Sequence, residues 1–165
     1  MSINASLIEE LRREAATTRR VLERVPEEHL SWRPHAKSMS LGQLAAHLAG
    51  LPDAIAQLVT ELDVEVPNVP LREATDCASL LQTLDRSVDE AARRLSAWTD
   101  DDLRALWTLR GPNGPIFTVP RLGVIRSIML NHSYHHRGQL TVYLRLLDVA
   151  VPSVYGPSAD ENPFA

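Results

Sequence analysis

Two histidines, His132 and His136, lie four residues apart in a segment whose apolar residues recur with a helical period. Four residues advance an α-helix by about 400°, so the two rings lie about 40° apart, one turn above the other. The same face carries the apolar residues Ile125, Met129, Leu140, Tyr143 and Leu147. Burying a polar ring without a partner costs about 1–3 kcal/mol, and one metal ion between the imidazoles would satisfy both.

A third histidine, His47, lies far upstream in another amphipathic segment, on one stripe with Leu44 and Leu51. Three core-facing histidines from two helices would offer three neutral nitrogens to a metal and leave a coordination position open. That ligand count is typical of catalytic zinc sites rather than closed structural ones. Imidazole suits zinc and nickel alike, so the expected cofactor is a divalent ion of either kind. The predicted metal ligands are His47, His132 and His136.

The other histidines are weaker candidates. His135 lies at the edge of the apolar stripe, where it could replace a ligand but is better placed beside the site or at the surface. His29 and His35 fall in a turn and an extended linker, so we expect both to be solvated. The alternative for the paired histidines is a core position satisfied by backbone groups or by each other.

Several polar residues near these histidines have open roles. Gln43 precedes His47 by one turn, but capping of the second helix already accounts for it. Gln139 shares the face of His132 and could hold a ligand ring or lie at the edge of the core. Arg137 points away from the histidines, which predicts a surface or interface position. In the tail, Tyr155 and Asp160 could border the site.

The composition favours one globular domain over residues 1–165, large enough to fold without disulfides. A formal charge of −4, with arginines scattered along the chain, offers no basic footprint for nucleic acid. The single cysteine, Cys77, is expected to be a small buried hydrophobe. No signal sequence and no apolar run approaching 18 residues is evident, so we expect a soluble, cytoplasmic protein that does not bind membranes.

Four long segments have the apolar period of amphipathic helices, and the signal for strands is weak. Between the third and fourth segments, the stretch 106–119 surrounds a Gly-Pro-Asn-Gly-Pro turn and predicts a small hairpin or lid-like loop. We expect a restart or bend near Gly50 and Pro52 in the second helix. The fold class is therefore all-α, a four-helix bundle with a short irregular or hairpin insertion before the last helix. The expected helices span about 4–24, 40–62, 75–97 and 120–148, with a loop over 64–70 and an irregular tail over 149–165.

Three stretches of the chain, 32–47, 131–145 and 151–158, resemble segments of the DinB-like, or YfiT-like, family of metal-dependent enzymes. The first leads to His47, and the second holds His132 and His136. The resemblance implies an up-down-down-up bundle, a divalent metal on these three histidines and a homodimer. Some members of that family are transferases or isomerases that use low-molecular-weight thiols such as bacillithiol and mycothiol.

Two functions remain open at this point. In the first, the protein is an enzyme whose metal activates water or a low-molecular-weight thiol, as a hydrolase or thiol S-transferase would. In the second, the metal only stabilises a non-enzymatic bundle with a binding or stress-response role. A cavity of several hundred Å³ beside the metal would favour the enzyme. Apolar Leu130 and Leu144, on the otherwise polar side of the last helix, add weak support for a dimer.

Overall fold

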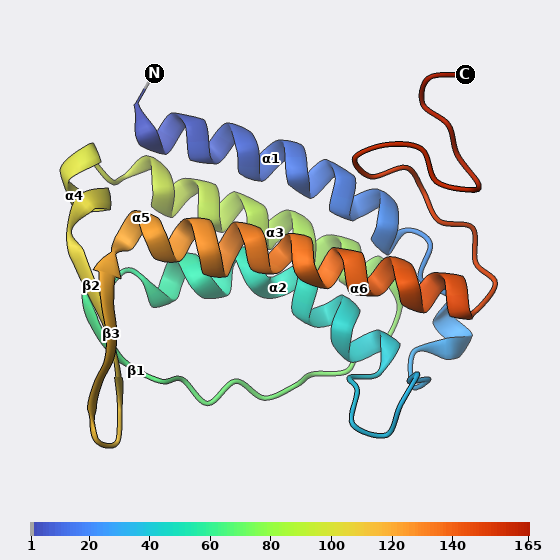
Figure 1. Ribbon diagram of the computed structural model, residues 1–165, viewed down its shortest axis with the longest axis horizontal. Helices are drawn as coiled ribbons and strands as arrows, with labels where there is room; N and C mark the ends of the chain where they lie inside the picture. The colour runs from blue at the N-terminus through green and yellow to red at the C-terminus, as the bar shows by residue number, and fades with distance from the viewer. Residues whose placement is uncertain (1) are drawn as a thin grey trace.

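The computed structural model describes residues 2–165, most of which belong to long helices packed side by side (Figure 1). The long helices are α1 (Ile3–Leu22), α2 (Leu41–Leu58), α3 (Cys77–Ser96) and α6 (His132–Leu146), and a short helical turn, η1 (Glu27–His29), follows α1. Figure 1 shows α1 and α6 running in one direction and α2 and α3 in the other. The long connection 59–76 returns the chain along the bundle, so α3 can run parallel to α2. The molecule therefore has the expected up-down-down-up arrangement of four helices.

Apolar residues on the inner faces of these helices form one core. Fully burying a leucine or isoleucine side chain stabilises the fold by about 1.5–3 kcal/mol, so these faces hold the bundle together. The largest residues with almost no exposed surface include Leu22, Leu41, Leu44, Leu48, Leu95, Leu103, Trp107, Ile125, Met129, Leu130 and Leu140.

The start of α2 is fixed by the predicted capping box. The hydroxyl of Ser40 accepts a hydrogen bond from the main-chain N–H of Gln43, and the Gln43 side-chain oxygen accepts one from the N–H of Ser40, each at 3.0 Å. This reciprocal pair satisfies two N–H groups that would otherwise lack a partner at the start of the helix. Gln43 is therefore a capping residue, and its side-chain oxygen is engaged by the cap rather than by the histidines.

Of the restart or bend expected near Gly50 and Pro52 in α2, the restart does not occur, because the helix continues to Leu58 with Pro52 inside it. A proline in a helix removes one N–H and crowds the carbonyl of the preceding turn. Here the next N–H, that of Asp53, donates to the hydroxyl of Ser87 on α3 at 2.9 Å. Packing on α3 thus offers a replacement partner, and no restart of the helix is needed.

The insertion before the last helix is the predicted hairpin, with one strand more than expected. After a short helix, α4 (Asp100–Arg104), strands β2 (Leu106–Gly111) and β3 (Gly114–Pro120) pair antiparallel. A third strand, β1 (Asp63–Glu65), pairs parallel with β2 and gives the order β1-β2-β3. The loop expected over 64–70 therefore begins as an edge strand, a pairing too short and too distant along the chain to leave a periodic signal.

The last helical stretch is built from α5 (Arg121–Val124), the π-helical segment η2 (Ile125–Asn131) and α6. It starts and ends close to the expected bounds of 120 and 148. A π-helical turn is rare and occurs often at functional sites. In this chain it lies immediately before His132.

The predicted surface position of Arg137 is wrong. Its side chain is 1% exposed, and its guanidinium donates to the Glu14 carboxylate at 2.8 Å and to the Glu14 carbonyl at 3.0 Å. Leu130 and Leu144, which lie seven residues before and seven residues after Arg137, are also buried and belong to the core. The last helix packs against α1 as well as α2, so it has two buried stripes where one was expected. Leu130 and Leu144 consequently give no support to a dimer.

The tail 149–165 contains no helix or strand and packs on the body through polar contacts. The Tyr155 hydroxyl donates to the Glu14 carboxylate at 2.7 Å, Arg20 binds Glu161 at 2.6 Å, and Asp160 pairs with Arg145. Tyr155 and Asp160 do not border the histidines, contrary to expectation, because these partners hold them elsewhere.

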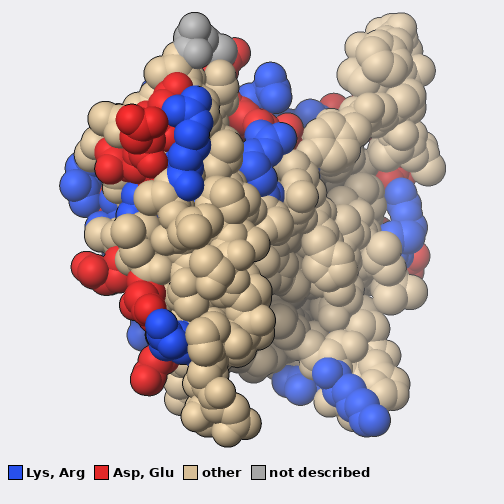
Figure 2. Space-filling view, turned by 60° about the vertical axis from the view of Figure 1, so that its left-hand side comes forward, with Lys and Arg blue, Asp and Glu red and all other residues tan. Residues whose placement is uncertain are grey.

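The face shown in Figure 2 has no continuous basic area. Acidic and basic groups lie next to one another near the left and upper edges of this view, and most of its middle carries no charged side chain. Within residues 2–165, no helix has the length and apolar character that crossing a membrane requires.

Arg137 and Arg145 give a matched test of the buried pair. Replacing Arg137 by alanine leaves the largely buried Glu14 carboxylate without its cationic partner and with only the Tyr155 hydroxyl as a donor, so the free energy of unfolding should fall by about 3–5 kcal/mol. Arg145→Ala removes an exposed ion pair of the same helix and should cost less than about 1 kcal/mol. Denaturant unfolding measures both values, and equal losses would contradict the structural role assigned to Arg137.

Candidate metal centre

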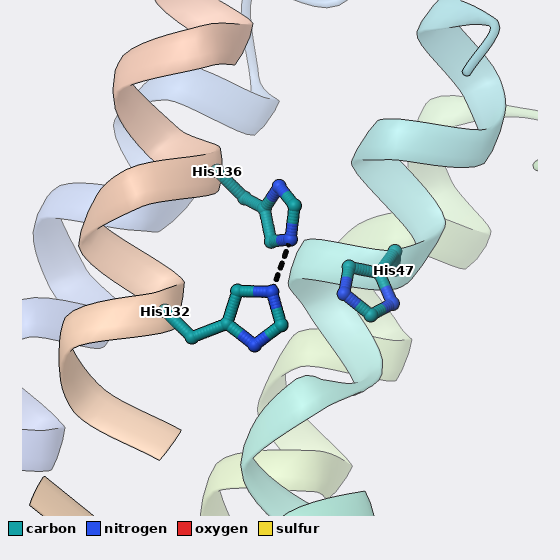
Figure 3. Close-up of side chains that lie close together, drawn as sticks. All are labelled: His47, His132 and His136. Atoms are coloured by element: carbon teal, nitrogen blue, oxygen red, sulfur yellow. Dashed lines mark hydrogen bonds between the residues drawn. The ribbon is translucent and has the colours of Figure 1, made fainter. Parts of the chain in front are cut away.

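The three predicted ligands meet between α2 and α6 (Figure 3). His47 projects from α2 towards His132 and His136 on α6, and one nitrogen from each ring lies within 4.8 Å of the other two. The ring centroid of His136 is 4.3 Å from that of His132 and 4.7 Å from that of His47. The helical spacing of His132 and His136 and the packing of α2 on α6 are what bring these rings together. This cluster could hold a metal ion.

The orientation of His136 is fixed by Gln139, one turn further along α6. The Nδ1 atom of His136 lies 2.7 Å from the side-chain oxygen Oε1 of Gln139. A carboxamide oxygen only accepts, so Nδ1 must carry the ring proton. The other nitrogen, Nε2, then presents its lone pair to the centre of the cluster. Such a contact selects the tautomer of a metal-binding histidine.

His132 contacts His136 through one nitrogen of each ring. Its Nε2 lies 2.6 Å from Nε2 of His136. Because the proton of His136 is on Nδ1, this contact in the metal-free protein needs the single proton of His132 on its Nε2. A divalent ion held by His47, His132 and His136 would take the place of that proton. The donor set therefore fits a divalent metal ion.

Burial lowers the pKa of all three histidines below 6.5. Loss of hydration is the largest cause for each, and the neighbouring rings add to it. The pKa of His136 falls to about 4, although its hydrogen bond with Gln139 acts in the opposite direction. At neutral pH the rings are therefore uncharged, which is the form that binds metals.

The remaining histidines and the cysteine lie outside the cluster. His135 is exposed, with its ring centroid 5.0 Å from that of His136, which fits its expected place beside the ligands. His29 and His35 are exposed, as expected for solvated residues. Cys77 is only half-buried at the start of α3, where its thiol donates to the carbonyl of Val25 and where burial raises its pKa. A thiol held protonated in this way is a poor nucleophile.

A cavity of about 730 Å³ opens beside the cluster, with His47 and His132 in its wall. It lies between α2 and α3 and is bounded on another side by residues 69–75 of the long connection. A volume of this size matches small-molecule sites in proteins. Sequence reasoning missed the cavity and its lining arginines, Arg72 and Arg86, because neither is close to a histidine along the chain.

Two carboxylates also line the cavity, and both are already engaged. Asp53 pairs with Arg94 at 3.3 Å, and Glu73 accepts a hydrogen bond from the Ser40 hydroxyl. Within the part of the chain that the structure describes, the cluster of potential metal ligands contains histidines alone.

Relatives of known sequence and structure share this architecture. The model of the DinB family matches residues 1–163. The chain is 26% identical over 149 residues to the Bacillus subtilis protein named uncharacterized protein YrdA, an alignment that covers 90% of this chain and 85% of YrdA.

Solved structures agree on the fold. A DinB-like protein from Bacillus cereus ATCC 10987 superposes with a TM-score of 0.73 at 24% identity, covering 93% of this chain and 98% of that one. YfiT from Bacillus subtilis, described as a probable metal-dependent hydrolase with an unusual four-helix bundle topology, gives 0.69 at 17% identity and covers 89% of each chain. Identities this low establish the fold alone. The family match over almost the whole chain goes further and shows that the protein belongs to the DinB family.

Proposed function

We propose that this protein binds one divalent metal ion through His47, His132 and His136 and acts as a metal-dependent enzyme on a small molecule. One observation carries the proposal: three neutral ring nitrogens converge within 4.8 Å of one another, and two of the three rings, those of His47 and His132, line a cavity of about 730 Å³. A closed structural site would not need such a space. Zinc and nickel are the favoured ions, because both suit imidazole.

A divalent ion bound here would supply Lewis acidity that brings the pKa of water or a thiol towards neutrality. The protein's part is to hold three uncharged ligands, which leaves the full charge of the ion available. Gln139 keeps the lone pair of His136 aimed at the cluster. His47 and His132 connect this centre with the cavity, where the reacting molecule would lie.

We propose one of two reaction classes. In the first, the metal activates water and the protein is a hydrolase; in the second, it activates a low-molecular-weight thiol and the protein is a thiol S-transferase. The description of YfiT as a probable metal-dependent hydrolase supports the first. Thiol transfer is supported only by the resemblance to thiol-using members of the family. Both carboxylates of the cavity are engaged, so the proton released from water or thiol would pass to the leaving group or to solvent.

The alternative is a non-enzymatic bundle in which the metal only stabilises the fold. That function predicts a small, closed pocket around the ion, and the open cavity counts against it. A homodimer remains part of the proposal by family resemblance, and light scattering of the purified protein measures it directly.

Metal stoichiometry in histidine variants tests the ligand set. We expect one divalent ion per chain in protein purified without an affinity tag. His47→Ala, His132→Ala and His136→Ala should each abolish stoichiometric binding, because two imidazoles hold a divalent ion far more weakly than three. Gln139→Ala should weaken it by about 10–100-fold, the usual effect of losing a partner of a ligating histidine.

His135→Ala and His35→Ala are the matched controls, because they remove histidines that the structure places outside the cluster. Both should retain the metal. If His135→Ala loses the metal and His136→Ala keeps it, the assignment of ligands along α6 is wrong.

The pH dependence of metal affinity follows from the lowered pKa values. Protons compete with the metal only below the pKa of each ligand in the folded protein, and burial moves that pKa below 6.5. The affinity should therefore stay nearly constant from about pH 8 to about pH 6.5 and fall at lower pH. Titration against a chromophoric chelator measures it, and a fall that begins above about pH 7 would contradict the burial of the ligands.

Activity measurements separate the enzyme from the metal-stabilised bundle. Hydrolysis of 4-nitrophenyl esters and transfer of cysteine to 1-chloro-2,4-dinitrobenzene should be compared for the metal-loaded protein, the chelated protein and His132→Ala. We expect the loaded protein to accelerate at least one reaction and the other two to give the uncatalysed rate. A loaded protein that accelerates neither, yet unfolds at a higher temperature than the metal-free form, would favour the non-enzymatic alternative.

A further inference from the structure

The cavity beside the histidines has an excess of free positive charge. Four charged side chains line it besides the histidines: Asp53, Glu73, Arg72 and Arg86. The two acids have partners, since Asp53 pairs with Arg94 and Glu73 accepts from Ser40. Neither Arg72 nor Arg86 forms an ion pair or a side-chain hydrogen bond with any residue in the range 2–165. The two cationic groups thus outnumber Glu73, the one lining carboxylate without a charged partner in the range 2–165, and the cavity carries a net positive charge.

Arg86 is the better placed of the two arginines. It belongs to α3, on the same face as Ser79 and Thr83, which also line the cavity. A helix holds its side chains at defined positions, whereas Arg72 lies on the irregular connection. The planar guanidinium can bind both oxygens of a carboxylate or phosphate at once. Arg86 therefore offers an anchor for an oxyacid group.

The α2 wall of the cavity is made of small residues. Ala46, Gly50 and Ala54 line it around and after His47. A Cβ atom built on Gly50 would meet no atom within 4 Å, so this position borders open space. Room for an apolar or uncharged group therefore lies one helical turn from a predicted metal ligand.

We infer that the cavity takes a small anionic molecule with an apolar body. Its oxyacid group binds Arg86, with Arg72 nearby, and its body lies against Ala46, Gly50 and Ala54. The far end of the molecule then reaches His47 and His132. This inference rests on the proposed function and deepens it by naming the substrate class, a carboxylate- or phosphate-bearing molecule, and its test needs no bound metal.

Two fluorescent dyes with the same aromatic body test the inference on metal-free protein. 8-Anilino-1-naphthalenesulfonate carries an anionic group, and N-phenyl-1-naphthylamine lacks it. The wild-type protein should bind one sulfonate dye per chain and prefer it to the neutral dye. Arg86→Gln should lower the affinity for the sulfonate dye by on the order of tenfold, which is the usual effect of losing a charge-assisted hydrogen bond. Its affinity for the neutral dye should be unchanged.

Gly50→Leu fills the space beside His47 and should lower the affinity for both dyes. Arg24→Gln serves as the control, because Arg24 is exposed and lies outside the cavity. Octanoate and octyl phosphate should displace the sulfonate dye, and octanol should not; the stronger competitor identifies the natural oxyacid. Equal binding of the two dyes, or equal losses in Arg86→Gln and Arg24→Gln, would overturn the inference. Its failure leaves metal stoichiometry untouched, so it is distinguishable from failure of the proposed function.

Discussion

Three imidazoles, of which that of His136 is buried and those of His47 and His132 are half-buried, face one another across α2 and α6 and impose the main constraint on this structure. Each ring has lost hydration, which lowers its pKa, and the nitrogens of His132 and His136 lie only 2.6 Å apart. Gln139 favours the tautomer of His136 that turns its lone pair inward. In a metal-free protein the contact between His132 and His136 needs the single proton of His132. A divalent cation could take the place of that proton, and three ring nitrogens that converge beside a cavity fit metal binding better than core packing.

The rest of the bundle places α2 and α6 so that these rings meet. The parallel pairing of α2 and α3 requires the long connection 59–76, and part of that connection walls the cavity beside His47. On the other side of α6, Arg137 binds Glu14 of α1, and Tyr155 of the tail joins the same group. The last helix is thus held on one side by a buried ion pair and carries the histidines on the other. Stability and the candidate site depend on different faces of one helix.

The sequence was sufficient for the helices, the capping box and the hairpin, because each depends on spacing within one segment. It also pointed to His47, His132 and His136 by their places on the apolar stripes of two helices, and the structure brings these three rings together. The sequence was insufficient wherever distant segments meet. Arg137, Leu130 and Leu144 were misplaced because a helix packed between two neighbours buries a second stripe that polarity conceals. Strand β1 has only three residues and pairs with a partner far along the chain, Asp63 lying opposite Thr108. The role of Gln139 was left open, because helical spacing places it on the face of His132 but cannot show which ring nitrogen its side chain contacts.

The most direct test of the metal centre is X-ray absorption spectroscopy of the protein loaded with one equivalent of zinc. Three imidazole ligands at about 2.0–2.1 Å, completed by one or two oxygen atoms from solvent or an added ligand, are the predicted result. His135→Ala should leave this spectrum unchanged. A first coordination shell with fewer than three imidazoles, or one closed by four protein ligands, would contradict an open site built from His47, His132 and His136.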